Sequence, residues 1–235
     1  MSKLLKKIIK STPVIGGIAV SLNQAIKNKK EADIVKDFKS REYWESRYSA
    51  NGNSGAGSYK HFAEFKAETI NKFVNENNIE SVLELGCGDG NQLKLANYKK
   101  YIGFDVSEKS ITLCKGLFKN DATKEFRLMD SYANEKCQLT LSLDVIYHLV
   151  EDEVFYAYMK TLFAAAERYV IIYASNTDDQ SFTSAIHVRH RKFTLWIENN
   201  CPDWKLIKHI PNKYPYNGDT TKTSFADFYI FGLID

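Results

Sequence analysis

The sequence predicts an α/β protein built on a mostly parallel sheet with helices on both of its faces. Short apolar runs alternate with stretches whose apolar residues recur at helical spacing. Each of the first four runs is followed by a glycine-rich turn or an aspartate, and alternation of this kind indicates βαβ units. The 235 residues are 44% hydrophobic, which is enough for one large core and excludes a mainly disordered chain.

The individual elements follow from the same patterns. The apolar runs predict five strands, at 82–85, 101–104, 126–129, 139–143 and 169–173. Helical spacing predicts helices at 59–77, 91–97, 108–118, 152–166 and 193–199. Ser107 is placed to cap the helix that begins at 108, and acidic residues fill the first turn of the helix that begins at 152. The strand-like segments 204–210 and 228–233 are expected to form an antiparallel hairpin at the edge of the sheet.

The N-terminus forms a basic arm, which we place at residues 1–40. This arm holds nine lysines and three acidic residues, whereas residues 41–235 hold 23 basic and 26 acidic residues. The globular part is therefore no basic platform, and we expect no nucleic-acid partner. Residues 3–10 place leucine and isoleucine on one helical face and lysines on the other, which suits weak contact of residues 1–30 with an anionic membrane surface or a partner. A frayed arm without that role is the alternative.

The remaining composition points to the cytoplasm, with an option of peripheral contact at the inner face of the membrane. The four cysteines form no C-x-x-C pair and no zinc-ligand spacing, as expected of reduced thiols. The apolar stretch 13–22 is too short to span a bilayer and is interrupted by Gly16 and Gly17. We therefore expect one cytoplasmic domain over residues 41–235, without a metal.

The segment V-L-E-L-G-C-G-D-G at 82–90 carries the chemistry. A buried strand leads into a glycine-rich turn, where the absence of side chains lets the backbone bend sharply and lets a ligand approach closely. A Walker loop requires G-K-[ST], which is absent, and a dinucleotide fingerprint requires G-x-G-x-x-G, whereas this loop reads G-x-G-x-G. A nucleoside-type cofactor lying over the loop is the remaining possibility.

Acidic residues at the strand ends support this interpretation. Asp105 ends the second strand, where its carboxylate can accept hydrogen bonds from both hydroxyls of a ribose. Asp130 ends the third strand, where it can accept from an adenine amine beside the Ser131 backbone, and Asp144 ends the fourth. In open α/β sheets, ligands bind at the carboxyl ends of the strands. The alternative for any one of these acids is that it only caps the following helix.

Taken together, these motifs resemble the class I S-adenosylmethionine-dependent methyltransferases. E-L-G-C-G-D-G (84–90) is similar to their first motif, and I-G-F-D-V-S (102–107) to the acidic motif after it. L-S-L-D-V-I-Y-H-L-V-E-D (141–152) is similar to the segment after their fourth strand. The resemblance implies a Rossmann-like sheet of seven strands. It also implies that S-adenosyl-L-methionine is the cofactor and S-adenosyl-L-homocysteine the product.

A closer resemblance covers most of residues 41–231. The pieces Y-W-E-S-R-Y, G-N-S-G-A-G-S-Y, F-K-A-E, H-V-R-H-R-K-F and T-S-F-A-D-F look like a bacterial subgroup often linked to surface-polysaccharide or capsule assembly. In relatives the segment before the first helix closes over the cofactor, which implies a helical lid at 41–78 with its loop at 53–59. Tyr43, Tyr48 and Lys66 are expected near that loop, and a flexible linker is the alternative.

These arguments give one set of expected cofactor contacts. They are Glu84, Gly86, Cys87, Gly88, Asp105, Val106, Asp130, Ser131, Leu143, Asp144 and Tyr59.

The acceptor side is predicted from two groups of residues. His148 lies just beyond a strand end and is the candidate general base, because a neutral imidazole can take a proton near pH 7; a histidine that only packs is the alternative. The basic segment 187–192 suggests a grip on an anionic acceptor, or else a solvated loop. Its H-x-x-H pair has no third ligand in sequence reach, so no metal is expected. The expected substrate contacts are His187, Arg189, His190, Arg191, Tyr147 and Asn176.

The predicted function is O-methylation of a small anionic acceptor, such as a sugar, a sugar phosphate or nucleotide, or another precursor of a surface glycan. Two alternatives are an RNA methyltransferase and a non-catalytic cofactor-binding protein. The segment 141–152 has no N/D-P-P-Y/W motif, which argues against methylation of nucleic acid. The sequence does not specify the acceptor, the methylated atom or the oligomeric state.

Overall fold

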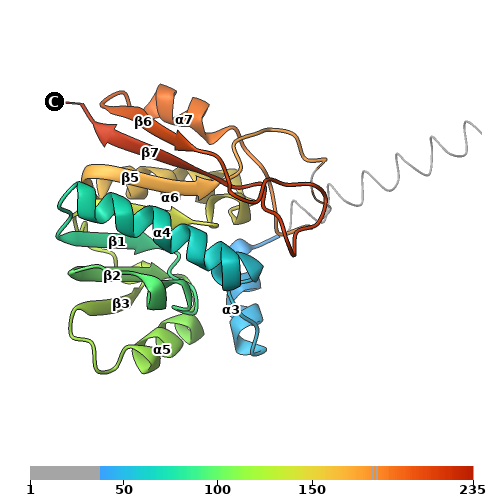
Figure 1. Ribbon diagram of the computed structural model, residues 1–235. Coiled ribbons are helices and arrows are strands. Elements are labelled where there is room, and N and C mark those ends of the chain that lie inside the picture. The colour runs from blue at the N-terminus through green and yellow to red at the C-terminus, as the bar shows by residue number, and fades with distance from the viewer. Residues whose placement is uncertain (1–37, 182, 184, 235) are drawn as a thin grey trace, which may run out of the picture. The chain divides into compact units, whose positions relative to one another are not determined.

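A seven-stranded sheet with the strand order β3-β2-β1-β4-β5-β7-β6 forms the centre of the fold (Figure 1). This computed structural model describes residues 38–181, 183 and 185–234. The strands are β1 (Ser81–Leu85), β2 (Lys100–Asp105), β3 (Lys124–Leu128), β4 (Cys137–Leu143), β5 (Ala166–Ala174), β6 (Trp204–Ile210) and β7 (Asp227–Leu233). Strands β1 to β5 pair in parallel, and β7 pairs antiparallel with both β5 and β6. The predicted Rossmann-like sheet with a C-terminal antiparallel hairpin is confirmed.

Helices cover both faces of this sheet. They are α4 (Lys60–Glu76), α5 (Glu108–Leu117), α6 (Asp152–Ala164) and α7 (Phe193–Asn200), whereas α3 (Ser40–Ser49) lies at the carboxyl edge of the sheet (Figure 1). One core cluster contains buried residues of α4 and α5, and the cluster on the opposite face contains those of α6 and α7. Figure 1 shows α4 crossing the face of the sheet turned to the viewer. The short 3-10 turns are η1 (Ala56–Ser58), η2 (Gln92–Leu95), η3 (Met129–Ser131) and η4 (Ile146–His148).

The central strands are mostly apolar and almost fully buried because both of their faces are covered. Val82, Leu83 and Leu85 in β1 are all buried, and they alternate between the two core clusters. Strand β5 is longer than the predicted 169–173. The prediction began too late because the strand starts with the exposed, charged residues Glu167 and Arg168, which interrupt the apolar pattern.

One predicted helix is absent. The segment 91–97 forms only the 3-10 turn η2 instead of an α-helix. Both ends of this segment are held by other elements: the Asn91 side chain donates to the Ser58 carbonyl at 2.7 Å, and the Asn97 N–H donates to the Asn71 side chain at 2.9 Å. These contacts replace the continuation of the helix.

Residues 39–235 form one compact unit, close to the predicted domain 41–235. The evidence for a basic arm rests on residues 1–37, which lie outside the described residues, and so does the stretch 13–22. Among the described helices, none has the length and apolar character needed to cross a bilayer.

The packing of α6 predicts a clear contrast between two of its positions. Met159 is 0% exposed in the core beneath the sheet, whereas Val154 on the same helix is 41% exposed. Met159→Ala should lower the free energy of unfolding by about 2–5 kcal/mol through lost burial and a residual cavity. Val154→Ala should change it by less than about 0.5 kcal/mol. Urea denaturation of both variants measures the difference, and similar values would contradict this packing.

Candidate functional site

The glycine-rich loop after β1 has a backbone that only glycine adopts without strain. Gly86 and Gly88 have φ angles of 84° and 59°. The N–H groups of Gly86 and Cys87 both donate to the carbonyl of Phe104, at 2.7 and 3.0 Å, and so tie the loop to β2. A Cβ at Gly86 would lie 2.5 Å from a methyl carbon of Val145. The loop is therefore fixed in place and closely approached on two sides.

The segment 53–59, predicted to be a lid, packs directly on this loop. A Cβ at Gly88 would lie 2.3 Å from the Ser54 hydroxyl oxygen and 3.1 Å from that of Tyr48. Asp89 accepts hydrogen bonds from the Ser54 N–H at 2.9 Å and from the Tyr59 hydroxyl at 2.7 Å. Burial alone would raise the pKa of Asp89, but these hydrogen bonds lower it. The Asp89 carboxylate therefore connects the lid segment 53–59 to the glycine loop.

Asp105, the predicted ribose acceptor, supports the loop from β2. Its carboxylate accepts from the Gly88 N–H at 2.9 Å and from the Ser107 N–H at 3.0 Å. The residue is 7% exposed, and burial raises the pKa of its carboxyl group. Each carboxylate oxygen therefore already has a backbone donor.

A cavity of about 580 Å³ opens between α3 and the ends of β2 and β3, and it includes Asp130, the residue predicted to accept from the adenine amine. Its lining residues come from α3, from the ends of β2 and β3 and from the start of α5: Arg41, Glu42, Glu45, Ser46, Ser49, Val106, Glu108, Leu128 and Asp130. Asp130 is paired with Arg41 at 2.5 Å. Ser131 is not among the lining residues, and its hydroxyl donates to the Leu128 carbonyl at 2.7 Å.

A buried ion pair lies on the other side of the loop. The ammonium of Lys66, from α4, is 2.6 Å from the carboxylate of Asp144, which follows β4. The Tyr147 hydroxyl donates to the second oxygen of Asp144 at 2.8 Å. Gly57 packs so closely that its Cβ would lie 2.6 Å from an Asp144 oxygen. Tyr147, predicted as a substrate contact, is buried and serves to hold this carboxylate.

Three further predicted cofactor residues lie beneath the loop. Glu84 accepts from the Tyr101 hydroxyl at 2.7 Å, and burial raises the pKa of its carboxyl group to about 7. Cys87 and Leu143 belong to the same buried core cluster. The carboxyl group of Glu84 therefore titrates near neutral pH.

His148 lies in a cluster of aromatic and imidazole rings. Its Nδ1 is 2.9 Å from the carbonyl oxygen of His187. Because a carbonyl only accepts, Nδ1 carries the proton, and the lone pair of the neutral ring is on Nε2. Burial lowers the pKa of His148 to about 4, so the ring is neutral at pH 7. This tautomer and charge are those of a proton acceptor.

The other rings of this cluster come from α3 and from the loop before α7. The His187 ring lies between the rings of Tyr43 and His148, stacked at centroid distances of 4.6 and 5.3 Å. Trp44 meets the His148 ring edge-on at 4.9 Å. We call Tyr43, Trp44, His148 and His187 the ring cluster. The sequence placed Tyr43 near the lid, but it gave no sign that Trp44 would reach His148.

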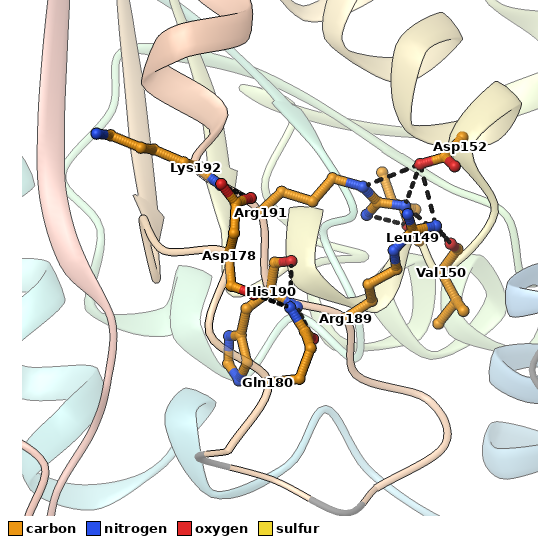
Figure 2. Close-up of polar contacts among 9 residues, drawn as sticks. All are labelled: Leu149, Val150, Asp152, Asp178, Gln180, Arg189, His190, Arg191 and Lys192. Atoms are coloured by element: carbon orange, nitrogen blue, oxygen red, sulfur yellow. Dashed lines mark hydrogen bonds and ion pairs between the residues drawn. The ribbon is translucent and has the colours of Figure 1, made fainter. Parts of the chain in front are cut away.

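The structure does not form the predicted anion clamp from Arg189 and Arg191. Arg191 donates to the carbonyls of Leu149 and Val150 at 2.6 and 2.8 Å, and it pairs with Asp152 at 3.1 Å (Figure 2). Arg189 donates to the Val150 carbonyl and pairs with Asp152, both at 3.0 Å. Both guanidinium groups hold the start of α6, which leaves Arg191 no role as an anion ligand.

Two more predicted substrate contacts are structural as well. Asn176 exchanges hydrogen bonds with the backbone and hydroxyl of Thr194, at 3.2 and 2.9 Å, and so fixes the start of α7. His190 is buried, with Nδ1 2.6 Å from the Ser175 hydroxyl. Within residues 38–181, 183 and 185–234, no three histidine, cysteine or acidic side chains come together as metal ligands.

The role of Arg191 can be tested by its effect on stability. Arg191→Met removes the donor of the Leu149 carbonyl and one of the two arginine contacts made by Val150 and by Asp152, so the free energy of unfolding should fall by about 2 kcal/mol. Arg189 is more exposed and gives one carbonyl bond, so Arg189→Met should cost about 1 kcal/mol or less. Chemical denaturation measures both. An unchanged stability of Arg191→Met would restore the interpretation as an anion ligand.

Comparisons with known proteins support the same assignment of the fold. Residues 83–170 match the protein family described as "Methyltransferase domain". The N-methyltransferase NodS from Bradyrhizobium japonicum, solved with S-adenosyl-l-homocysteine, is 14% identical with a TM-score of 0.66, over 84% of this chain and 100% of that one. Magnesium protoporphyrin IX methyltransferase from Synechocystis, solved with bound SAM, is 14% identical with a TM-score of 0.58, over 83% and 98%.

A third structure, an S-adenosylmethionine-dependent methyltransferase from Clostridium acetobutylicum, is 13% identical with a TM-score of 0.54, over 72% of this chain and 91% of that one. A comparison with curated protein sequences found no match. The chain therefore has the Rossmann-like fold of the methyltransferases, and its residues 83–170 match their domain family.

Proposed function

We propose that the protein is an S-adenosylmethionine-dependent methyltransferase. The observation that carries this proposal is the glycine loop at the carboxyl edge of the sheet, together with a cavity of about 580 Å³ between α3 and the ends of β2 and β3 at the same edge. Ligands of open α/β sheets bind at this edge. The match of residues 83–170 to methyltransferase domains and the fold of the chain support the same conclusion.

Lys66 and Asp144 form a buried ion pair at the same edge, and they could bind the carboxylate and the ammonium of the cofactor's amino acid group only if this pair separated. When bound, the cofactor supplies a methyl group on a positively charged sulfur. The chain's own task is to hold the acceptor in line with that methyl group and to receive the acceptor's proton.

We place the acceptor at the ring cluster and propose that its reacting atom is a hydroxyl oxygen. A hydroxyl must lose its proton during the transfer, and Nε2 of the neutral His148 carries the lone pair that can receive it. The resemblance to glycan-assembly methyltransferases favours a sugar or a phosphorylated precursor. For such an anionic acceptor we propose Arg47 as the cation, because its guanidinium lies 5.5 Å from the Trp44 ring centroid. Its Nε donates to the Asn53 carbonyl at 2.7 Å and one terminal nitrogen contacts the Tyr43 hydroxyl at 3.3 Å, so the acceptor would bind at the other terminal nitrogen.

Cofactor binding is tested first at Gly88. An alanine there would meet Ser54 at 2.3 Å and would require a strained φ of 59°, so Gly88→Ala should bind S-adenosylhomocysteine at least about 10-fold more weakly than the wild type. Gly116→Ala is the matched control, because no atom lies within 4 Å of its added Cβ. Isothermal titration calorimetry measures both. A wild-type protein that does not bind S-adenosylhomocysteine would refute the proposed function.

The base is tested at His148. His148→Asn keeps a side-chain N–H for the His187 carbonyl but removes the basic lone pair. We expect kcat to fall by about 10²- to 10⁴-fold, with unchanged affinity for S-adenosylhomocysteine. The acceptor for this assay comes from a screen of nucleotide sugars, phosphorylated sugars and phosphate esters for S-adenosylhomocysteine release. An unchanged kcat would exclude His148 as the base.

A further inference from the structure

We infer that Glu45, on helix α3, binds the ribose of the cofactor by accepting hydrogen bonds from its hydroxyl groups. The inference rests on the proposed function and adds a residue that lies outside the glycine loop and outside the strand ends. Four observations carry it: an oxygen without a donor, the position of Glu45 along the cavity, the contacts of Asp105 and the charges of the cavity lining.

The carboxylate of Glu45 is incompletely satisfied. Its Oε1 accepts a long hydrogen bond of 3.3 Å from the Ser49 hydroxyl. Its Oε2 is buried and has no hydrogen-bond partner in the part of the chain that the structure describes. A buried acceptor without a donor costs about 1–3 kcal/mol, and more when it is charged, so such a group at a cavity indicates that a ligand supplies the donor.

The position of Glu45 is the one that a ribose would require. Arg41, one turn before it, pairs with Asp130 at the proposed adenine end of the cavity. Tyr48, about one turn after it, contacts Ser54 at 3.0 Å beside Gly88. Seven residues of helix span about 10 Å, which is close to the length of an adenosine. Glu45 lies between the two ends, where the sugar joins the base to the sulfur-bearing chain.

Asp105 leaves room for this second acceptor. Its two oxygens already accept from Gly88 and Ser107, and it is not among the residues that line the cavity. A ribose presents two neighbouring hydroxyls, each of which needs an acceptor when it is removed from water. A carboxylate on α3 supplies one from the side opposite to the sheet.

The charge of the cavity agrees with a nucleoside ligand. Its lining contains four carboxylates and one guanidinium, on Glu42, Glu45, Glu108, Asp130 and Arg41. Such a surface attracts hydroxyl and amine donors and repels phosphate. A nucleoside with a positively charged sulfur therefore fits the cavity better than a nucleotide does.

The test compares Glu45→Met with Glu42→Met, a second carboxylate of the same helix and the same cavity lining. Calorimetry with S-adenosylhomocysteine should show about 10-fold weaker binding by Glu45→Met and nearly unchanged binding by Glu42→Met. Thermal unfolding of both variants shows whether they remain folded. Equal affinity of Glu45→Met and the wild type would overturn the inference.

A second measurement isolates the ribose. Analogues of S-adenosylhomocysteine that lack the 2′ or the 3′ hydroxyl should bind the wild type at least about 10-fold more weakly than the parent compound, and one of them should bind Glu45→Met as well as the parent does. If Glu45→Met discriminates against both analogues as strongly as the wild type, the role of Glu45 is refuted while the proposed function stands. If the wild type binds none of these compounds, the proposed function itself fails.

Discussion

The site depends on the hydrogen bond from the Gly88 N–H to the carboxylate of Asp105. This bond joins the glycine loop after β1 to the end of β2, and it fixes Gly88 in a conformation that only glycine adopts readily. Ser54 then packs on the bare Cα of Gly88, and Asp89 holds the same lid segment by two further hydrogen bonds. One buried carboxylate at a strand end thus holds the glycine on which the lid segment packs.

The sheet and most helices are predictable because their determinants are local. The apolar run 139–143 is covered on both faces, and the acidic first turn of α6 follows from the favourable charge at a helix N-terminus. The segment 91–97 deviates from its helical pattern because Asn91 and Asn97 are bound by distant residues. Local patterns hold until a tertiary contact outweighs them.

The acceptor side was less predictable, because its residue types suit several roles. An arginine serves equally well as an anion ligand and as a donor to backbone carbonyls, and Arg191 contacts carbonyls about 40 positions earlier in the chain. Asn176 likewise caps α7 rather than facing a substrate. Glu45, in contrast, was not predicted as a site residue. In the sequence it is one acidic residue of a polar helix, and only the structure shows that it lines the cavity and that its Oε2 has no hydrogen-bond donor among the described residues.

Helix α3 presents different residues to the two halves of the site. Arg41 and Glu45 line the cavity proposed for the adenosine, whereas Tyr43 and Trp44 contact the imidazoles of the ring cluster. A shift of this short helix therefore alters both halves at once. Mutational changes that tailor it to another acceptor would also change the affinity for the methyl donor, so selection on either property constrains the other. His187, which contacts the ring cluster and does not line the cavity, is a position where a substitution would alter the proposed acceptor side alone.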